Sequence, residues 1–150
     1  MAHHPIDSAI AFILLVGIVS GSFVYVFSAR TPEGYIGISG TELTPAIAQQ
    51  MHLSSDSGFL IIKVEQSSPA EKAGIKGGNI DAQIGGLPVK IGGDVIVAVD
   101  GHPVQGTSDL ISNLKDKNIG DKIDFTVLRA GNSTADLSVT VEPKPNSLFQ

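Results

Sequence analysis

The chain has 150 residues, of which 10 are Lys or Arg and 15 are Asp or Glu, so its formal net charge is −5 at neutral pH. This length suits one domain with its own core, and the lack of a basic cluster argues against nucleic acid as a partner. The sequence contains no cysteine, which excludes a disulfide framework and thiolate-bound metals. Its 17 glycines predict many tight turns, which are typical of a small β-rich fold.

An uncharged apolar run over residues 9–29 divides the chain. As a helix it would extend about 30 Å, the thickness of a bilayer core, and Tyr25 stands near one end, where interfacial aromatic residues are common. The alternatives are a buried core helix and a cleaved signal peptide, but residues 1–8 contain no Lys or Arg, unlike most signal peptides. We therefore predict a short N-terminal segment (1–8) and one transmembrane helix (9–29) of undecided orientation.

A polar hinge at residues 30–34 precedes a first series of short elements. The predicted elements are a strand at 35–39, a helix at 43–51, a strand at 59–64 and a helix within 67–74. Thr44 and Ser68 are suited to cap the two helices, because each is followed by a proline that fits the first helical position. Gly74 is suited to end the second helix.

Gly-Gly pairs punctuate the second half of the chain and predict a hairpin with its turn at residues 85–86. Further predicted elements are a strand at 95–99, a helix at 107–117 capped by Thr107 or Ser108, strands at 123–129 and 135–141, and a disordered tail at 144–150. Leu110, Ile111 and Leu114 share one face of the helix. With five to six strands and two to three helices, the sequence predicts an α+β domain whose sheet is partly open and barrel-like.

Four segments, in a fixed order, resemble the PDZ domains of HtrA/DegP serine proteases. Tyr35–Ile38 (YIGI) resembles their carboxylate-binding loop, and Ser67–Ile75 (SSPAEKAGI) resembles their SPAxxAGL signature. Gly92–Val104 resembles their GDxIxxxxGxxV signature, and Arg129–Gly131 their turn before the final strand. The resemblance implies a PDZ-like partly open β-barrel or sandwich over residues 35–143. The glycine-rich insertion at 76–93 departs from short PDZ domains and resembles a longer form of some HtrA-like proteases.

This resemblance implies a peptide-binding site. A PDZ domain adds an extended peptide to a sheet edge, and converging backbone N–H groups hold the terminal carboxylate, for which a glycine such as Gly37 is suited. The residues expected to bind peptide are Tyr35, Ile36, Gly37, Ile38, Leu110, Ile111 and Leu114. The apolar members are equally typical of a core, and spacing leaves open whether Leu110 or Ile111 faces the groove.

Patterns for catalysis are missing from the sequence. Gly131–Ser133 resembles part of the serine protease nucleophile motif, but Thr134 and Ala135 follow where that motif has glycines, so we predict a turn. The H-E-x-x-H and phosphate-binding loop patterns are absent. We therefore predict no enzymatic activity, metal or cofactor.

These observations together predict a membrane-anchored PDZ module on the extracytoplasmic side that binds C-terminal or extended hydrophobic peptides of protein partners. Tethering at the membrane raises the local concentration of such a module, so an adaptor in protein quality control that serves a separate protease is the expected role. The alternative is the non-catalytic part of a truncated or split HtrA-like serine protease. Both depend on a sheet edge beside the helix at 107–117 that is open to an incoming strand.

Overall fold

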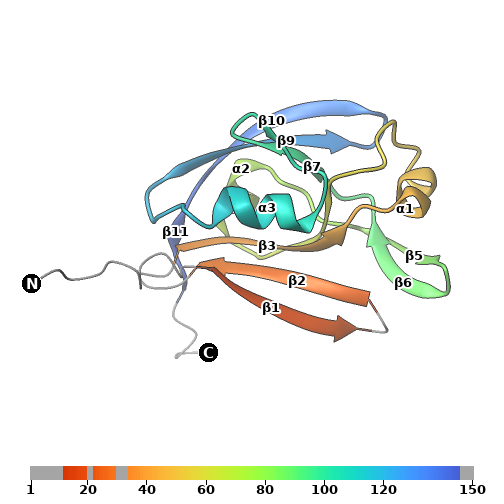
Figure 1. Cartoon of the computed structure of the whole chain (residues 1–150), viewed down its shortest axis with the longest axis horizontal. Coiled ribbons are helices and arrows are strands. Elements are labelled where there is room, and N and C mark those ends of the chain that lie inside the picture. The colour runs from red at the N-terminus through yellow and green to blue at the C-terminus, as the bar shows by residue number, and fades with distance from the viewer. Residues whose placement is uncertain (1–11, 20–21, 30–33, 146–150) are drawn as a thin grey trace, which may run out of the picture.

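The computed structural model describes residues 12–19, 22–29 and 34–145 of the chain (Figure 1). Its strands are β1 (Phe12–Val19), β2 (Ser22–Ala29), β3 (Gly34–Glu42), β4 (Phe59–Val64), β5 (Ile80–Ile84), β6 (Leu87–Ile91), β7 (Val95–Val99), β8 (His102–Pro103), β9 (Lys122–Arg129), β10 (Ser133–Thr140) and β11 (Glu142–Pro143). Its helices are α1 (Pro45–Gln50), α2 (Pro69–Ala73) and α3 (Thr107–Leu114).

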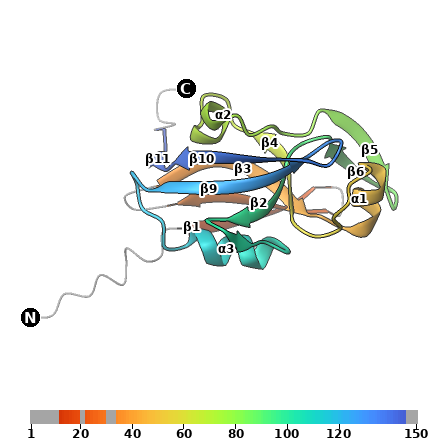
Figure 2. The ribbon, with the colours of Figure 1, turned by 90° about the horizontal axis from the view of Figure 1, so that it is seen from above.

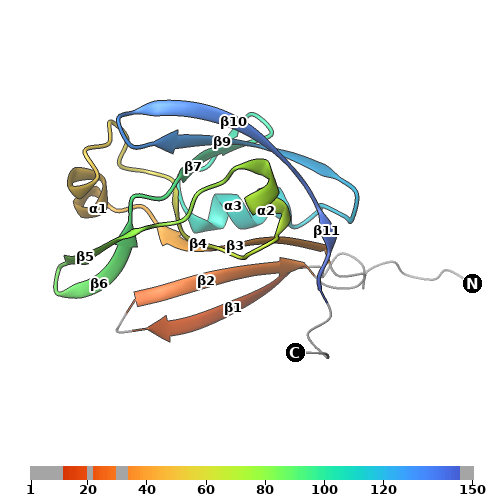
Figure 3. The ribbon, with the colours of Figure 1, turned by 180° about the vertical axis from the view of Figure 1, so that it is seen from behind.

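Most strands form one antiparallel sheet in the order β1-β2-β3-β4-β7-β9-β10, with β8 paired to β7 and β11 paired to β3. The sheet curls, so that β9 and β10 lie across the domain from β3 (Figures 1 and 3), and α2 and α3 lie on opposite sides of these strands (Figure 2). β5 and β6 form a separate hairpin at the end of the domain that also carries α1 (Figure 2). This arrangement is the partly open, curled sheet that the sequence predicted for the domain.

Two apolar clusters fill the domain. The larger joins β3, β4, β7, β9, β10 and α3, and its side chains include the fully buried Phe59 and Phe125. The smaller lies under α1 and includes Ile47, Leu60 and Leu128. Burying a side chain of this size contributes about 2 kcal/mol, so these clusters supply the main driving force for folding.

Local sequence signals account for the first two helices. The hydroxyl of Thr44 accepts a hydrogen bond from the N–H of Ile47 at 3.3 Å, and a proline occupies the first turn of α1. The hydroxyl of Ser68 likewise accepts a bond from the N–H of Glu71 at 3.2 Å, and Gly74 ends α2 with a left-handed φ of +93°. Both predicted caps and the predicted end of α2 are confirmed.

The start of α3 differs from the prediction. Gly106 is the N-cap residue and makes no side-chain cap bond, while Thr107 is already helical. The carboxylate of Asp109 instead turns back and accepts a hydrogen bond from the N–H of Gln105 at 2.9 Å. This bond satisfies a backbone donor just ahead of the helix. At its other end, α3 stops at Leu114 rather than at residue 117.

The apolar run at residues 9–29 also differs from the prediction. Its described part forms two strands, β1 and β2, which pair with each other from Phe12↔Ala29 to Val19↔Ser22. Within the described ranges no helix is long and apolar enough to cross a membrane. The run is rich in Val, Ile, Phe and Tyr, which favour strands, so its hydropathy alone could not separate helix from strand.

Several predicted segments fall where the structure gives no description. The N-terminal segment (1–8), residues 30–33 of the hinge and residues 146–150 of the tail lie outside the described residues. Gly34, the last residue of the predicted hinge, is the first residue of β3.

Candidate functional site

Gly37 adopts a backbone conformation that the YIGI segment requires. Its φ is +81°, and a Cβ added there would stand 2.3 Å from the Cβ of Ser68. Only glycine tolerates both the positive φ and this close approach. The carbonyl of Gly37 accepts a hydrogen bond from the N–H of Glu65 at 2.8 Å, so the segment is held tightly between β4 and α2.

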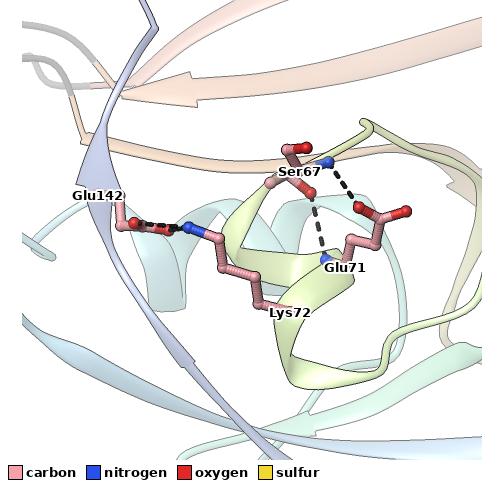
Figure 4. Close-up of polar contacts among 5 residues, drawn as sticks. Ser67, Glu71, Lys72 and Glu142 are labelled. Carbon is pink, nitrogen blue, oxygen red and sulfur yellow. Dashed lines mark hydrogen bonds and ion pairs between the residues drawn. The ribbon is translucent and has the colours of Figure 1, made fainter.

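The SPA motif holds the beginning of β3 from the side of α2 (Figure 4). Ser67 has a φ of +61°, and its N–H donates to the carboxylate of Glu71 at 2.5 Å, so that Glu71 binds Ser67 through its side chain and Ser68 through its backbone N–H. Lys72 then forms an ion pair with Glu142 at 3.0 Å. Since Glu142 lies opposite Tyr35 in the β11–β3 pairing, α2 and β11 together position the YIGI segment.

Tyr35 is half-buried and covers Gly37. Its hydroxyl oxygen lies 3.0 Å from the point that a Gly37 Cβ would occupy. Burial, and after it the negative charge of Glu65, raises the pKa of the Tyr35 hydroxyl above its usual value. Tyr35 therefore stays a neutral hydrogen-bonding group at physiological pH.

The apolar residues predicted for the site do gather in one place. Ile36, Ile38, Leu110 and Leu114 all belong to the larger core cluster and are 3% exposed or less. Ile111 is half-buried and packs against the same cluster. The structure thus decides what spacing left open: Leu110 points into the core, and Ile111 is the more accessible of the two.

Both edges of β3 are paired. Along one edge β3 meets β11 at residues 34–35 and β4 at residues 38–42. Along the other it meets β2, from Tyr25↔Gly40 to Ser28↔Tyr35, as the ribbons lying side by side show (Figures 1 and 3). The expectation that this second edge is open to an incoming strand is therefore wrong for this structure, because a strand of the chain itself lies there.

The pairing of β2 with β3 is interrupted at the predicted carboxylate loop. The register passes from Val26↔Ser39 directly to Ser28↔Tyr35, so residues 36–38 of β3 stand opposite Phe27 alone. The pairing is interrupted because the positive φ of Gly37 bends β3 at this point. The YIGI segment consequently bulges out of the ladder that surrounds it.

An acidic depression lies at the other end of β3, where α3 begins. Its walls come from the end of β3, the start of α1, the loop before β4 and the first turn of α3. The lining residues are Glu42, Leu43, Pro45, Asp56, Ser57, Gln105, Gly106, Ser108 and Asp109. The carboxylate of Glu42 comes so near Gly106 that a Cβ there would be 2.9 Å from it. Three carboxylates with no basic residue in the lining make the depression favourable to positive charge.

An ion pair between the half-buried Arg129 and the buried Asp94 was not foreseen from the sequence. Arg129 donates to both carboxylate oxygens of Asp94, at 3.0 and 3.2 Å, and to the carbonyl of Gly74 at 2.7 Å. Asp94 also accepts from the N–H of Lys76 at 3.0 Å and is 2% exposed. The signal was present, since both charges stand within recognised motif segments, but their pairing depends on the fold.

The Gly131–Ser133 segment is the turn that the sequence predicted between β9 and β10. Gly131 and Asn132 have φ values of +83° and +63°. The side chain of Asn132 accepts from the N–H of Ser54 at 2.6 Å and donates to the carbonyl of His52 at 3.3 Å. It therefore fixes a loop and is not arranged as part of a nucleophile motif. In the described part of the chain, no group of three or more His, Asp or Glu side chains could hold a metal ion.

The fold and the YIGI segment define a class of protein. The family model described as "PDZ domain" matches residues 34–141, and the chain belongs to this family. The match begins at the start of β3 and ends at Val141, just before β11, so β1 and β2 lie outside it.

Similar proteins include bacterial endoproteases, each matched over only part of its own length. The chain is 31% identical over 112 residues to the "Probable periplasmic serine endoprotease DegP-like" of Rhizobium meliloti, covering 74% of this chain and 19% of that protein. It is 30% identical over 121 residues to the "Periplasmic serine endoprotease DegP" of Salmonella typhimurium, covering 81% of this chain and 22% of that protein. The chain thus spans about a fifth of the length of the curated relatives it matches.

Solved structures of similar fold carry peptide ligands. The HtrA3 PDZ domain bound to a phage-derived ligand (FGRWV) superposes with a TM-score of 0.54 at 25% identity, covering 73% of this chain and 85% of that one. The HtrA-type protease AlgW with a tripeptide superposes with a TM-score of 0.52 at 26% identity, covering 75% of this chain and 32% of that one. The fold is therefore that of HtrA-type PDZ domains.

Proposed function

We propose that the domain formed by residues 34–145 binds the C-termini of protein partners in extended conformation along β3. The observation that carries this proposal is the YIGI segment, in which Gly37 bends the backbone beside a cluster that contains Ile36, Ile38 and both leucines of α3. The backbone of β3 would supply the hydrogen bonds of strand addition. The last side chain of the peptide would lie against the apolar surface near Ile111, which favours an apolar C-terminal residue.

The polarity of the site gives the ligand a direction. If the carboxylate lies at residues 36–38, the peptide runs antiparallel to β3, and its upstream residues reach the acidic depression at Glu42. A basic residue upstream of an apolar C-terminus therefore suits this surface. We expect Tyr35, Gly37 and Ile111 to contact the end of the peptide, while Leu110 and Leu114 act from the core by holding α3 in place.

Binding of the pentapeptide FGRWV tests this proposal. Labelled at its amino end, the peptide should bind the full chain in fluorescence anisotropy, and the same peptide with an amidated C-terminus should bind at least tenfold more weakly, because the carboxylate is lost. Ile111→Ala should weaken binding several-fold, and the exposed neighbour Ser112→Ala serves as the matched control. Equal affinity for the acid and the amide would contradict the proposed carboxylate site.

We also propose that residues 9–29 attach the domain to a membrane on the extracytoplasmic side, as an adaptor that delivers partners to a separate protease. The support is the uncharged run itself, which would match a bilayer core if it left β3 and became a helix, and the word "periplasmic" in the names of the relatives. Co-flotation of the full chain with lipid vesicles, compared with a variant carrying Leu15→Asp and Val24→Asp, measures this attachment. Equal recovery of both chains with the vesicles would contradict it.

A second candidate function is a part of an HtrA-like serine protease whose catalytic domain lies elsewhere. The observation in its favour is that the relatives are named as endoproteases and are matched over about a fifth of their length. A casein-cleavage assay distinguishes the two: the adaptor function predicts no turnover by the rigorously purified chain, whereas turnover that copurifies with the chain would favour this second function.

A further inference from the structure

We propose that β2 is an internal occupant of the peptide-binding edge, so that docking of β2 and binding of a peptide exclude each other. The inference rests on the proposed function, because it assigns the ligand to β3. It begins from the topology: β4 and β11 take one edge of β3, which leaves a single edge for strand addition. β2 lies along that edge from Tyr25↔Gly40 to Ser28↔Tyr35.

The direction of β2 matches the direction of the proposed ligand. β2 is antiparallel to β3, and its later residues lie nearest the YIGI segment, just as the C-terminal residues of a peptide would. Ser28 stands opposite Tyr35, and Tyr25 stands opposite Gly40. A strand in this register uses the backbone groups of β3 that a peptide would need.

The domain does not depend on β2 for its family fold. The PDZ family match covers residues 34–141, and the large cluster behind β3 is built from side chains such as Phe59, Phe125 and Leu110, all beyond residue 34. β2 is an added strand, joined to the domain through the short stretch 30–33. A segment tethered so closely has a high effective concentration at its docking edge.

The consequence is a latent peptide site. When only a fraction of the molecules have β2 undocked, the apparent dissociation constant for a peptide rises in inverse proportion to that fraction. A partner, or a surface that takes up the apolar segment 12–29, would then open the site by removing β2. In this proposal β2 competes with any peptide for the same edge of β3.

A reversible crosslink tests the inference on the full chain. The natural sequence has no cysteine, so the double variant Val26→Cys/Ser39→Cys places one pair of thiols directly across the β2–β3 ladder. Oxidation should lock β2 onto β3 and weaken binding of labelled FGRWV at least tenfold, and reduction with dithiothreitol should restore it. Val26→Pro, which disturbs the ladder of β2, should instead strengthen binding.

A matched control separates the crosslink from its position. Thr126→Cys/Asp136→Cys joins the directly opposed residues of β9 and β10, away from β2, and its oxidation should leave affinity unchanged. Mass spectrometry reports crosslink formation in both variants. If the control pair forms and the Val26/Ser39 pair does not, β2 is not docked and the inference is overturned.

The remaining outcomes are also decisive. Equal peptide affinity of the locked and reduced forms, with the crosslink verified, overturns the inference while the proposed peptide site stands. If the reduced chain and Val26→Pro both fail to bind FGRWV, while the control variant remains folded by circular dichroism, the proposed function fails at this site. The two results can be told apart: in the first the peptide binds equally well with and without the crosslink, and in the second it does not bind at all.

Discussion

The two partners of β3 are held in different ways. β4 carries Phe59, Leu60 and Ile61, which are fully buried, and it continues the sheet into β7. β2 pairs with β3 and with β1 and lies outside the matched family region. A strand whose side chains form the core cannot leave without unfolding the domain, whereas a strand added outside the family fold can be exchanged for another. The comparison teaches that strand addition in this chain is possible on one edge of β3 only.

The largest expected effect comes from weakening the core side. Asp94→Ala leaves Arg129 without its buried carboxylate partner and the N–H of Lys76 without an acceptor. The expected loss is about 3 kcal/mol in the free energy of unfolding, measured by urea denaturation of the full chain. Asp81→Ala, which removes an exposed ion pair with Lys90, is the control and should change stability by less than about 0.5 kcal/mol.

The variant Gly37→Ala tests how tightly the YIGI segment of β3 packs against Ser68. Gly37 and Gly131 have nearly the same φ, +81° and +83°, so alanine at either costs about 1–2 kcal/mol for its left-handed backbone. Only at Gly37 does the new Cβ also collide with Ser68, while Gly131 has open space. Gly37→Ala should therefore destabilise by at least about 1 kcal/mol more in thermal or urea unfolding. Equal losses of stability for alanine at Gly37 and at Gly131 would mean that Ser68 and α2 move aside without a measurable cost.

A smaller effect is expected at the acidic depression, at the end of β3. Extending FGRWV at its amino end with two lysines should tighten binding several-fold relative to two glutamates, because Glu42, Asp56 and Asp109 line that end of β3. The difference should shrink in high salt, since the charges are near the surface. Affinities measured by anisotropy at low and high salt check this, and equal affinity of the two extended peptides would place the upstream residues elsewhere.

The smallest expected effect is a pH dependence at Asp100, an exposed residue in the turn that follows β7. Burial alone would raise the pKa of Asp100, but hydrogen bonds from Lys117 (2.6 Å) and the N–H of Asp124 (2.9 Å), and the Lys117 charge, outweigh it and lower the pKa. A lowered folded-state pKa means that the stabilisation is present above the unfolded value of about 3.9 and is lost as pH falls through the folded value.

The variant Asp100→Asn isolates this effect. It should cost under about 1 kcal/mol at neutral pH and progressively less below pH about 4, as the wild-type carboxylate also loses its charge. Urea unfolding of both chains across this range measures the difference. A difference that stays constant with pH would mean that the hydrogen-bond geometry matters more than the charge.

Some features of the candidate site could be predicted from the sequence, and others could not. The YIGI segment, Gly37 and the face of α3 were identified because a motif and a helical period are local properties. The pairing of β2 with β3 could not be predicted, because an apolar run indicates that a segment is buried but not which segment it packs against. The hydropathy of residues 9–29 is compatible both with a membrane helix and with a pair of strands.

By itself the sequence determined the domain between residues 34 and 143: its caps at Thr44 and Ser68, its hairpin at residues 85–86, its strands and its PDZ family. Those features depend on neighbours a few residues apart, where local sterics and hydrogen bonding decide. Only the tertiary structure decided that Leu110 faces the core, that Asp94 binds Arg129, and that β2 covers β3. Each of these joins positions distant in the chain or depends on which surface is left open, and burial and pairing between distant segments are properties of the packed whole.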